Sequence, residues 1–468
     1  SILIAILCSL LWVFFQNSLF AQILIPPDEL QYPPLKFQML KADRVELPNG
    51  ITMFFLEDRE LPLVHMNFLF RTGTVNDPAG KEGVAELTTY LMRTGGCKKF
   101  TSEQIDQRLD QLAASPSFSI SLDSASIRTT FFKSDLDTGM ELLSEMIIHP
   151  VFEEKKFDIA VALKKEGLRR IMDDPQRLAF REFNRLLYPD DSRGRYMTSA
   201  SLRQITRDDL AGFHKAHFFA GNMMIAISGD LSREEAVHLV TKHFGRWQQM
   251  GPVPEMPGPP AKLTGGFFLM RKKLTQSTLV SGEFTVGKKD PDYYAFLLLD
   301  FILGSGGFPS HIFSAVRNNE GLAYSAGSFY RARPEYGVFG TYAFTKTETT
   351  YQALTLMQSI LKKAAEGSIT NEELVWAKNS IRNGFIFSFD HPASIASQQM
   401  QIAFEKLPDD YLMQYLKNID AVTRNDLKRV AMKYLQEQKR ITLILGDTSN
   451  FGSPPNYLGE PVYITPQE

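Results

Sequence analysis

Apolar and polar positions follow a similar order in two parts of the chain, on either side of residues 250–262. Each part opens with two apolar, partly aromatic runs bounded by polar residues, and these runs predict strands at residues 51–57, 63–70, 266–271 and 277–284. The first part closes with a strand, a turn and a helix that we expect Ser232 to cap, in NMMIAISGDLSREEAVHLVTKHFGRW. The second closes with a helix and then a strand, in DLKRVAMKYLQEQKRITLILGD.

The middle of each part repeats a second pattern. When Pro175 is aligned with Pro392, Gly167 falls on Gly384, and a long helix-like segment precedes each proline. Proline suits the first turn of a new helix, so each copy predicts a helix, a break and a second helix. We therefore expect an α+β protein made of two homologous mixed α/β domains, each of about two hundred residues.

Prolines mark the boundary between the two copies. Five of the thirteen residues at 250–262 are proline, which favours extended backbone and cannot continue a helix. We predict a first domain at residues 40–249, a Pro-rich linker at 250–264 and a second domain at 265–450.

The N-terminal segment differs from the rest. Residues 2–15 are uncharged and apolar, but this run is short for a membrane span, and Ala21 is a small residue where a signal peptidase could cut. We interpret residues 1–21 as a secretory signal truncated at its start; an uncleaved membrane anchor is the alternative. After cleavage only Cys97 remains, so no internal disulfide can form, and we expect the bacterial periplasm.

The net charge of the chain limits the classes of binding partner that we expect. The 468 residues include 51 basic and 53 acidic ones, for a net charge of −2, and 44% are hydrophobic. This is the balance of a soluble globular protein, whereas nucleic acid or an anionic membrane would favour a basic excess. We expect neither nucleic-acid binding nor stable membrane insertion after the signal is cleaved.

Residue types that could carry chemistry are few. Among eight histidines only His214 and His217 are close in sequence, and no nearby carboxylate completes a metal site, so packing or helix capping is the expected role. No H-E-x-x-H, H-x-x-E-H, C-x-x-C or G-x-S-x-G motif occurs. Cys97 has no neighbouring histidine and is expected to be an unreactive, half-buried thiol.

One pair and one loop remain as candidates. Arg317 and Tyr324 stand seven residues apart across a glycine turn, and both are directional donors that could hold a peptide carbonyl or an oxyanion. Spacing alone also allows an arginine that complements a helix dipole and a tyrosine that packs in a strand. The GSGGFPS run at residues 304–310 lacks the spacing of a phosphate-binding loop and indicates close backbone approach.

At this point the chain resembles the insulinase/pitrilysin family, particularly the bacterial relatives of mitochondrial processing peptidase. Three separated segments carry the resemblance in the right order: LPNGITMFFLEDRELPLVHMNFLFRTGTVNDPAGKEGVAEL, NMMIAISGDLSREEAVHLVTKHFGRW and LGSGGFPSHIFSAVRNNEGLAYSAGS. The resemblance covers nearly all of the chain after the signal. It implies the family's architecture, a duplicated metallopeptidase half-clamshell.

The resemblance also implies what is missing. Catalytic members carry H-x-x-E-H on the first helix, where two histidines bind zinc and the glutamate polarises water. The corresponding positions here are Glu86, Thr89 and Tyr90, and the family's third ligand, a glutamate, falls at Gly167. Glu166 is adjacent but points about 100° away around a helix. We therefore expect no catalytic residue and no metal in this chain.

Heterodimers in this family pair a zinc-bearing subunit with a partner that supplies an arginine and a tyrosine. Arg317 and Tyr324 match that pair within VR…GLAYS, so the resemblance implies that they bind substrate backbone. Gly304, Gly306 and Gly307 lie where related subunits carry a substrate-handling loop. The family's substrate-contacting N-A-x-T edge-strand motif would fall at residues 115–121 and is replaced here, which puts peptide binding by the first domain in doubt.

These observations lead to one hypothesis and two rivals. The chain is expected to be inactive alone and to be the non-catalytic, substrate-binding subunit of a periplasmic zinc metalloendopeptidase. Its partner would be a sibling with H-x-x-E-H that holds the zinc, and its substrate an extended peptide. The first rival is a scaffold of the same fold with no peptidase partner. The second is a self-sufficient enzyme with metal at His214 and His217.

Overall fold

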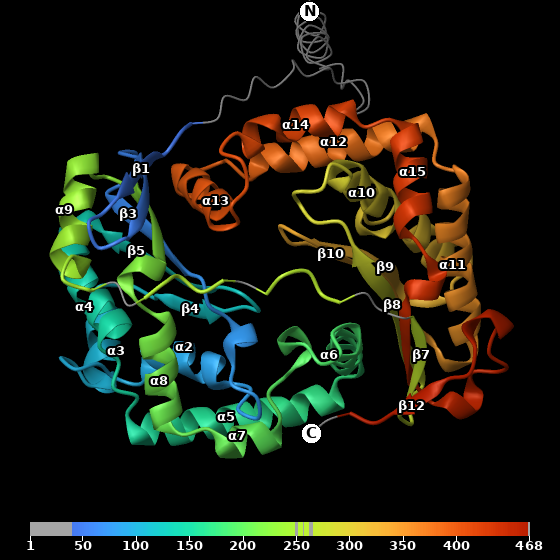
Figure 1. Cartoon of the computed structure of the whole chain (residues 1–468), viewed down its shortest axis with the longest axis horizontal. Coiled ribbons are helices and arrows are strands. Elements are labelled where there is room, and N and C mark those ends of the chain that lie inside the picture. Colours follow the sequence, from blue (N-terminus) through green and yellow to red (C-terminus); the bar gives the residue numbers. More distant parts are fainter. Residues whose placement is uncertain (1–39, 249–250, 256, 262–264, 467–468) are drawn as a thin grey trace, which may run out of the picture. The chain divides into compact units, whose positions relative to one another are not determined.

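Two six-stranded sheets organise the chain, and five strands of each follow the same order (Figure 1). The computed structural model describes residues 40–248, 251–255, 257–261 and 265–466, so the predicted signal at residues 1–21 lies outside the described residues. The first sheet has the order β1-β2-β6-β3-β5-β4 and the second β12-β7-β11-β8-β10-β9. In both, one inner pair is parallel, β2 with β6 and β7 with β11, and the three pairs that follow it in this order are antiparallel.

The strands of the first sheet come from the first part of the chain: β1 (Asp43–Glu46), β2 (Thr52–Glu57), β3 (Leu63–Phe70), β4 (Ser117–Ile120), β5 (Ala125–Phe132) and β6 (Met223–Gly229). Its helices are α2 (Val84–Thr94), α3 (Ser102–Gln111), α4 (Leu136–Ile148), α5 (Glu154–Asp173), α6 (Pro175–Leu187), α7 (Ser199–Gln204), α8 (Arg207–His217) and α9 (Arg233–Phe244). The predicted strands at 51–57 and 63–70 correspond to β2 and β3.

The second part contributes strands β7 (Gly266–Arg271), β8 (Gln276–Thr285), β9 (Ala323–Ala332), β10 (Gly337–Lys346), β11 (Ile441–Gly446) and β12 (Val462–Ile464). The outer strand β12 is parallel to β7, whereas the outer strand β1 of the first sheet is antiparallel to β2. Its helices are α10 (Tyr293–Asp300), α11 (Thr350–Glu366), α12 (Asn371–Phe387), α13 (Pro392–Phe404), α14 (Tyr411–Ala421) and α15 (Arg424–Tyr434). Two π-helical turns, η5 (Phe301–Ser305) and η6 (Phe313–Asn319), follow α10. The duplicated α+β fold is therefore confirmed.

Local sequence explains where several helices begin. Ser232 caps α9 as predicted: its hydroxyl accepts from the Glu235 backbone N–H, and the Glu235 carboxylate accepts from the Ser232 N–H. Pro175 and Pro392 occupy the first turns of α6 and α13. Asp174 also accepts two backbone N–H groups at the start of α6. The predicted helix, break and helix is thus present in both parts.

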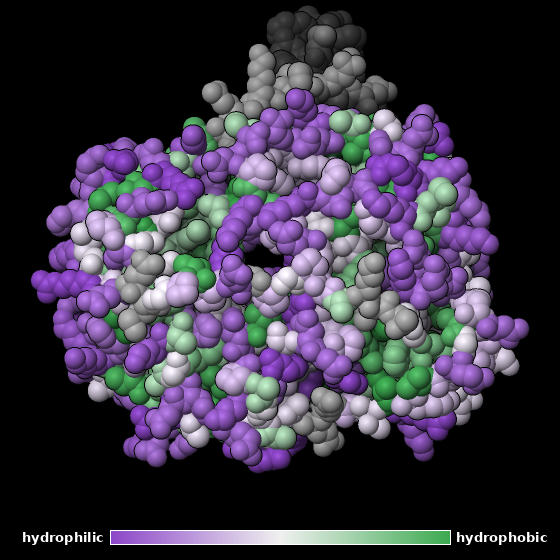
Figure 2. All heavy atoms as spheres, viewed as in Figure 1, coloured by the Kyte–Doolittle hydropathy of each residue, from purple (hydrophilic) through white to green (hydrophobic). Residues whose placement is uncertain are grey.

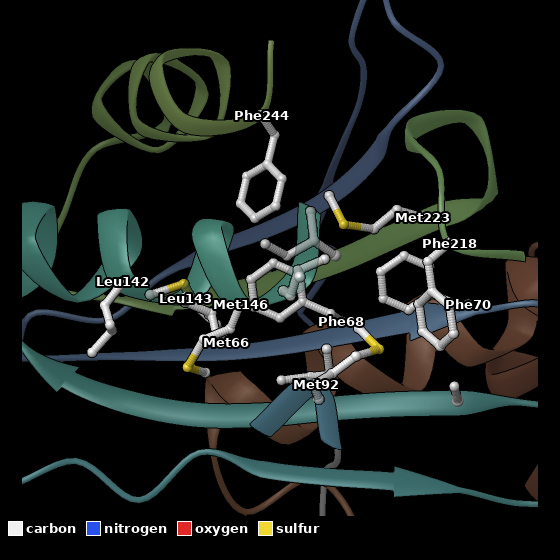
Figure 3. Close-up of a cluster of buried hydrophobic side chains, with 14 of the residues drawn as sticks. Met66, Phe68, Phe70, Met92, Leu142, Leu143, Met146, Phe218, Met223 and Phe244 are labelled. Carbon is white, nitrogen blue, oxygen red and sulfur yellow. The ribbon is translucent and has the colours of Figure 1, made fainter. Parts of the chain in front are cut away.

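Helices cover one face of the first sheet. Met66, Phe68 and Phe70 of β3 point into a buried cluster with side chains from α2, α4 and the segments around α8 and α9 (Figure 3). Alternate residues of a strand point to opposite faces, so the other side chains of β3 face away from this cluster. That opposite face is available for other contacts.

Each part of the chain places one helix against the sheet of the other part. Helix α6 packs on β8 and β11 of the second sheet, where Leu178, Phe183 and Leu187 join a buried cluster. Helix α13 packs on β2 and β6 of the first sheet, with Met400 and Phe404 buried there. Figure 1 shows α13 beside the first sheet and α6 beside the second. Residues Met39–Glu468 form one compact unit, and the separate domain limits stay a prediction.

The surface is mainly polar. Hydrophilic residues dominate the face shown in Figure 2, where hydrophobic residues appear as separate patches. In the part of the chain that the structure describes, no helix has both the length and the apolar character required to cross a membrane.

Candidate functional site

Helix α2 is held firmly at its start. The buried Asp77 carboxylate accepts hydrogen bonds from the backbone N–H groups of Gly83 (2.8 Å) and Ala85 (2.7 Å). Burial raises the pKa of Asp77 to about 6, although these two hydrogen bonds oppose that shift. Gly83 has a φ of 114°, a left-handed conformation that favours glycine. The glycine before this helix therefore serves the turn that aims it.

The side chains at the positions that correspond to the zinc motif make contacts with other protein groups. Glu86 forms an ion pair with Lys164 of α5, and the Lys164 ammonium lies 5.6 Å from the centre of the Tyr90 ring. The Thr89 hydroxyl is buried and donates to the Ala85 carbonyl of its own helix (3.0 Å). A fixed cation thus stands beside Glu86, where a metal would need further acceptor ligands.

The position of the third ligand, Gly167, carries no side chain. A Cβ atom at Gly167 would meet no other atom within 4 Å, so glycine there is not required by packing. The Glu166 carboxylate instead pairs with Arg169 (3.8 Å) and Arg170 (3.3 Å) on its own helix. Within the described ranges, no three His, Cys, Asp or Glu side chains gather as metal ligands. The residues present at α2 and α5 do not fit a catalytic zinc ion.

Arg317 and Tyr324 come together, one at the end of η6 and the other at the start of β9. The Arg317 guanidinium lies 5.3 Å from the centre of the Tyr324 ring, 4.8 Å from that of Phe313 and 5.7 Å from that of Phe308. Gly321, with a φ of 61°, makes the turn between them. Three aromatic rings surround one guanidinium, which restricts its orientation, and no described residue accepts a hydrogen bond from its N–H groups.

Tyr324 and Arg317 differ in their exposure to solvent. Tyr324 is 78% exposed and Phe308 67% exposed, although both are large aromatic residues. Arg317 is half-buried, and no carboxylate among the described residues forms an ion pair with it. An exposed phenol beside an unpaired, ring-bound guanidinium can offer hydrogen bonds to one carbonyl group of a ligand.

The glycines of the 304–310 loop have separate structural roles. A Cβ at Gly304 would lie 2.3 Å from the Ser328 backbone nitrogen, and one at Gly306 would lie 2.5 Å from the Phe301 carbonyl. Gly307 has a φ of 77° and open space around it. Gly304 and Gly306 therefore allow close packing, and Gly307 allows the turn that places Phe308 beside Arg317.

His214 and His217 are packed side chains. The His214 Nε2 lies 2.7 Å from the Ile147 carbonyl, and its ring stacks on Phe218. The His217 ring lies 4.4 Å from the Phe213 ring. Burial lowers the pKa of His214 to about 4 and also lowers the pKa of His217. Cys97 is likewise buried, and burial raises its thiol pKa.

The packed state of His214 predicts a pH-dependent stability. Its folded pKa lies below the usual 6.5, so the unfolded chain gains a proton first as pH falls. The free energy of unfolding should be highest above pH 6.5 and decrease by about 3 kcal/mol towards pH 4 through this residue. Denaturant unfolding of His214→Gln should show a flatter pH profile. The exposed His238, changed to Gln, serves as the control and should leave the slope unchanged.

Two features of this region were not anticipated from the sequence. Lys164 lies three residues before Gly167 and so shares its helix face, which was an available signal. The sequence of the 304–310 loop indicates close backbone approach and no role for the Phe308 side chain. In the structure the Phe308 ring packs on Phe313 (4.8 Å between centres) and beside Arg317. The predicted edge strand at 115–121 contains β4, which pairs only with β5 among the described strands.

Comparison with known proteins supports the fold. Residues 56–195 match insulinase (peptidase family M16), and residues 204–381 match the peptidase M16 inactive domain. An uncharacterized zinc protease of Rickettsia felis is 24% identical over 385 residues, covering 80% of this chain and 91% of the relative. The mitochondrial-processing peptidase subunit beta of Bos taurus is 21% identical, with coverage of 86% and 83%.

Solved structures agree with these matches. The peptidase M16 inactive domain from Pseudomonas fluorescens superposes with a TM-score of 0.81 at 25% identity, covering 88% of this chain and all of that one. A protease from Helicobacter pylori, at 21% identity and a TM-score of 0.79, shares the fold. With its paired sheets, its altered zinc positions and its inactive-type second half, this chain belongs to the insulinase family of peptidases, family M16, and lacks that family's H-x-x-E-H motif.

Proposed function

We propose that this chain is the non-catalytic, substrate-binding subunit of a zinc metallopeptidase, and that a sibling subunit with H-x-x-E-H holds the zinc. The observation that carries the proposal is the contact between Arg317 and Tyr324, which keeps two donors together at an exposed position. A chain that serves only as a scaffold would not need an exposed tyrosine ring beside a guanidinium that forms no ion pair with any described residue. This subunit would hold the peptide so that the bond to be cleaved faces the zinc of the sibling subunit.

The roles of the two donors follow from their surroundings. Arg317 is oriented by the Phe308, Phe313 and Tyr324 rings, so its planar donor group can hold a substrate carbonyl at low entropic cost. The Tyr324 hydroxyl can donate to the same carbonyl as negative charge develops on its oxygen. This chain supplies positioning and donors; the water activation requires the sibling's zinc.

The substrate is proposed to be an extended peptide. The N-A-x-T motif is replaced at residues 115–121, but backbone pairing does not require those side chains. The outer side of the edge strand β4 pairs with no other described strand, so a peptide strand can bind there through backbone hydrogen bonds. We place the complex in the bacterial periplasm, because the apolar segment at residues 2–15 has the composition of a secretory signal.

The rival function, a scaffold without a peptidase partner, is favoured by one observation: the Glu86–Lys164 ion pair has replaced the metal site. An affinity pull-down of the tagged chain from its native cells, followed by mass spectrometry and zinc analysis, separates the two functions. We expect a stoichiometric sibling carrying H-x-x-E-H, about one zinc per pair and peptidase activity. Recovery of the chain alone, or with unrelated proteins, would support the scaffold and overturn the proposal.

A further inference from the structure

A polar pocket lies on the face of the first sheet that turns away from the helical core. It has a volume of about 730 Å³ and is bounded by β3, β5 and β6 on one side and by α13 on the other. The apolar residues of α13 cover the β2 and β6 end of this face, so the pocket occupies the part towards β4. It is separate from the Arg317 and Tyr324 pair, which lies on the second sheet.

Strand register shows which side chains line this pocket. Asn67 of β3 is aligned with Arg128 of β5 and Ala226 of β6, and Arg128 is aligned with Ser117 of β4. Met66 and Phe68, the neighbours of Asn67, point into the helical core, so Asn67 points to the opposite face. One row of side chains therefore runs across the pocket from β6 to the edge strand.

The pocket contains hydrogen-bonding groups without partners. The Ser228 side chain is 1% exposed, and its hydroxyl oxygen has no hydrogen-bond partner among the described residues. The buried side-chain oxygen of Asn67 also has none. Leaving such groups unpaired is unfavourable, so a site that a polar ligand fills is a physical reason for them.

The charged side chains that line the pocket indicate the charge of the ligand it would bind. Arg128 and His65 line the pocket, whereas none of the residues that line it is Asp or Glu. His65 is held by a 2.9 Å contact between its Nδ1 and the Thr130 hydroxyl. No ion pair to Arg128 occurs within the described part of the chain. An uncompensated guanidinium in a polar pocket favours an anionic group, and a carboxylate matches its donor geometry.

The edge strand provides a route for this carboxylate. A peptide added to β4 would present alternate side chains to the same face, beside Ser117 and about 10 Å from β5. Ser117 is small, so the long Arg128 side chain can extend over it towards an acidic side chain of the peptide. We propose that this pocket binds a Glu or Asp side chain of the substrate, with Arg128 as its ionic partner and Asn67 and Ser228 as hydrogen-bond partners. The proposal rests on the peptide-binding function proposed above.

Binding of matched peptides tests the pocket. The tagged chain is purified from its own cells with any bound subunit retained, and a chelator prevents cleavage. Ten-residue peptides with one glutamate walked along a neutral sequence are compared with their glutamine counterparts by fluorescence anisotropy. We expect at least one glutamate position to bind about tenfold more tightly than glutamine at low salt. Arg128→Ala should abolish that preference, and Arg128→Glu should reverse it in favour of lysine. Arg203→Ala, which removes an exposed arginine on α7, is the matched control and should leave the preference intact.

The outcomes separate the two proposals. Peptides that bind without any difference between glutamate and glutamine would overturn the pocket and leave the proposed function standing. A preference that survives in Arg128→Ala would also overturn it. If no peptide binds to the wild-type protein, the proposed function fails and the pocket fails with it.

Discussion

Replacing Arg317 by alanine is expected to lower the kcat/KM of the assembled peptidase about 100-fold while the chain stays folded. The guanidinium is the group that would hold the substrate carbonyl opposite the zinc, and removal of one such donor costs about 2.7–4 kcal/mol in comparable sites. Arg317 makes no ion pair within the described residues, so its truncation removes contacts with aromatic rings but leaves no buried charge without a partner. Steady-state kinetics on the reconstituted pair measures the effect.

Two further variants separate charge from geometry. Arg317→Lys keeps the charge but loses the planar donor group, and it should recover only part of the activity. Arg331→Ala removes an exposed arginine from the same strand as Tyr324, together with its contact to Phe329 (5.1 Å), and should retain wild-type turnover. Wild-type kcat/KM for Arg317→Ala would rule out the assigned role.

Local patterns predicted most of the fold because they act over a few residues. Ser232 with Glu235, and prolines 175 and 392, set helix starts through contacts within one turn. The exchange of α6 and α13 between the sheets was not predictable in this way. An amphipathic pattern indicates that a helix has an apolar face, but not which of two similar sheets that face will cover.

The candidate site shows the same division. The seven-residue spacing of Arg317 and Tyr324 indicated a pair, and the structure brings the two side chains together. The aromatic enclosure by Phe308 depends on the conformation of Gly307, which composition alone does not specify. The Glu86–Lys164 ion pair joins residues 78 positions apart on two helices. The place of Lys164 on the helix face of Gly167 was a local signal, but its contact with Glu86 depends on how the two helices pack. Tertiary packing decided each of these contacts.

Replacing Arg440 by alanine is expected to destabilise the second half by about 3–5 kcal/mol, because it leaves a buried carboxylate without its cation. The Arg440 Nε lies 3.0 Å from the Glu283 Oε1, and the two side chains are 4% and 3% exposed. Among the described residues, the other Glu283 oxygen accepts a hydrogen bond from the Gln436 backbone N–H alone, at 3.2 Å. Urea unfolding of wild type and variant measures the difference.

The same variant should show a stronger pH dependence of stability than wild type. Burial already raises the pKa of Glu283 in the folded chain, and Arg440 opposes that rise. Without Arg440 the folded pKa moves further above the unfolded value of 4.5, so the folded state binds more protons than the unfolded state. The free energy of unfolding of Arg440→Ala should then be larger at pH 5 than at pH 8. Adding Glu283→Gln removes the titrating group and should restore stability at pH 8 and flatten the profile. An Arg440→Ala variant as stable as wild type at pH 8 would contradict the buried ion pair.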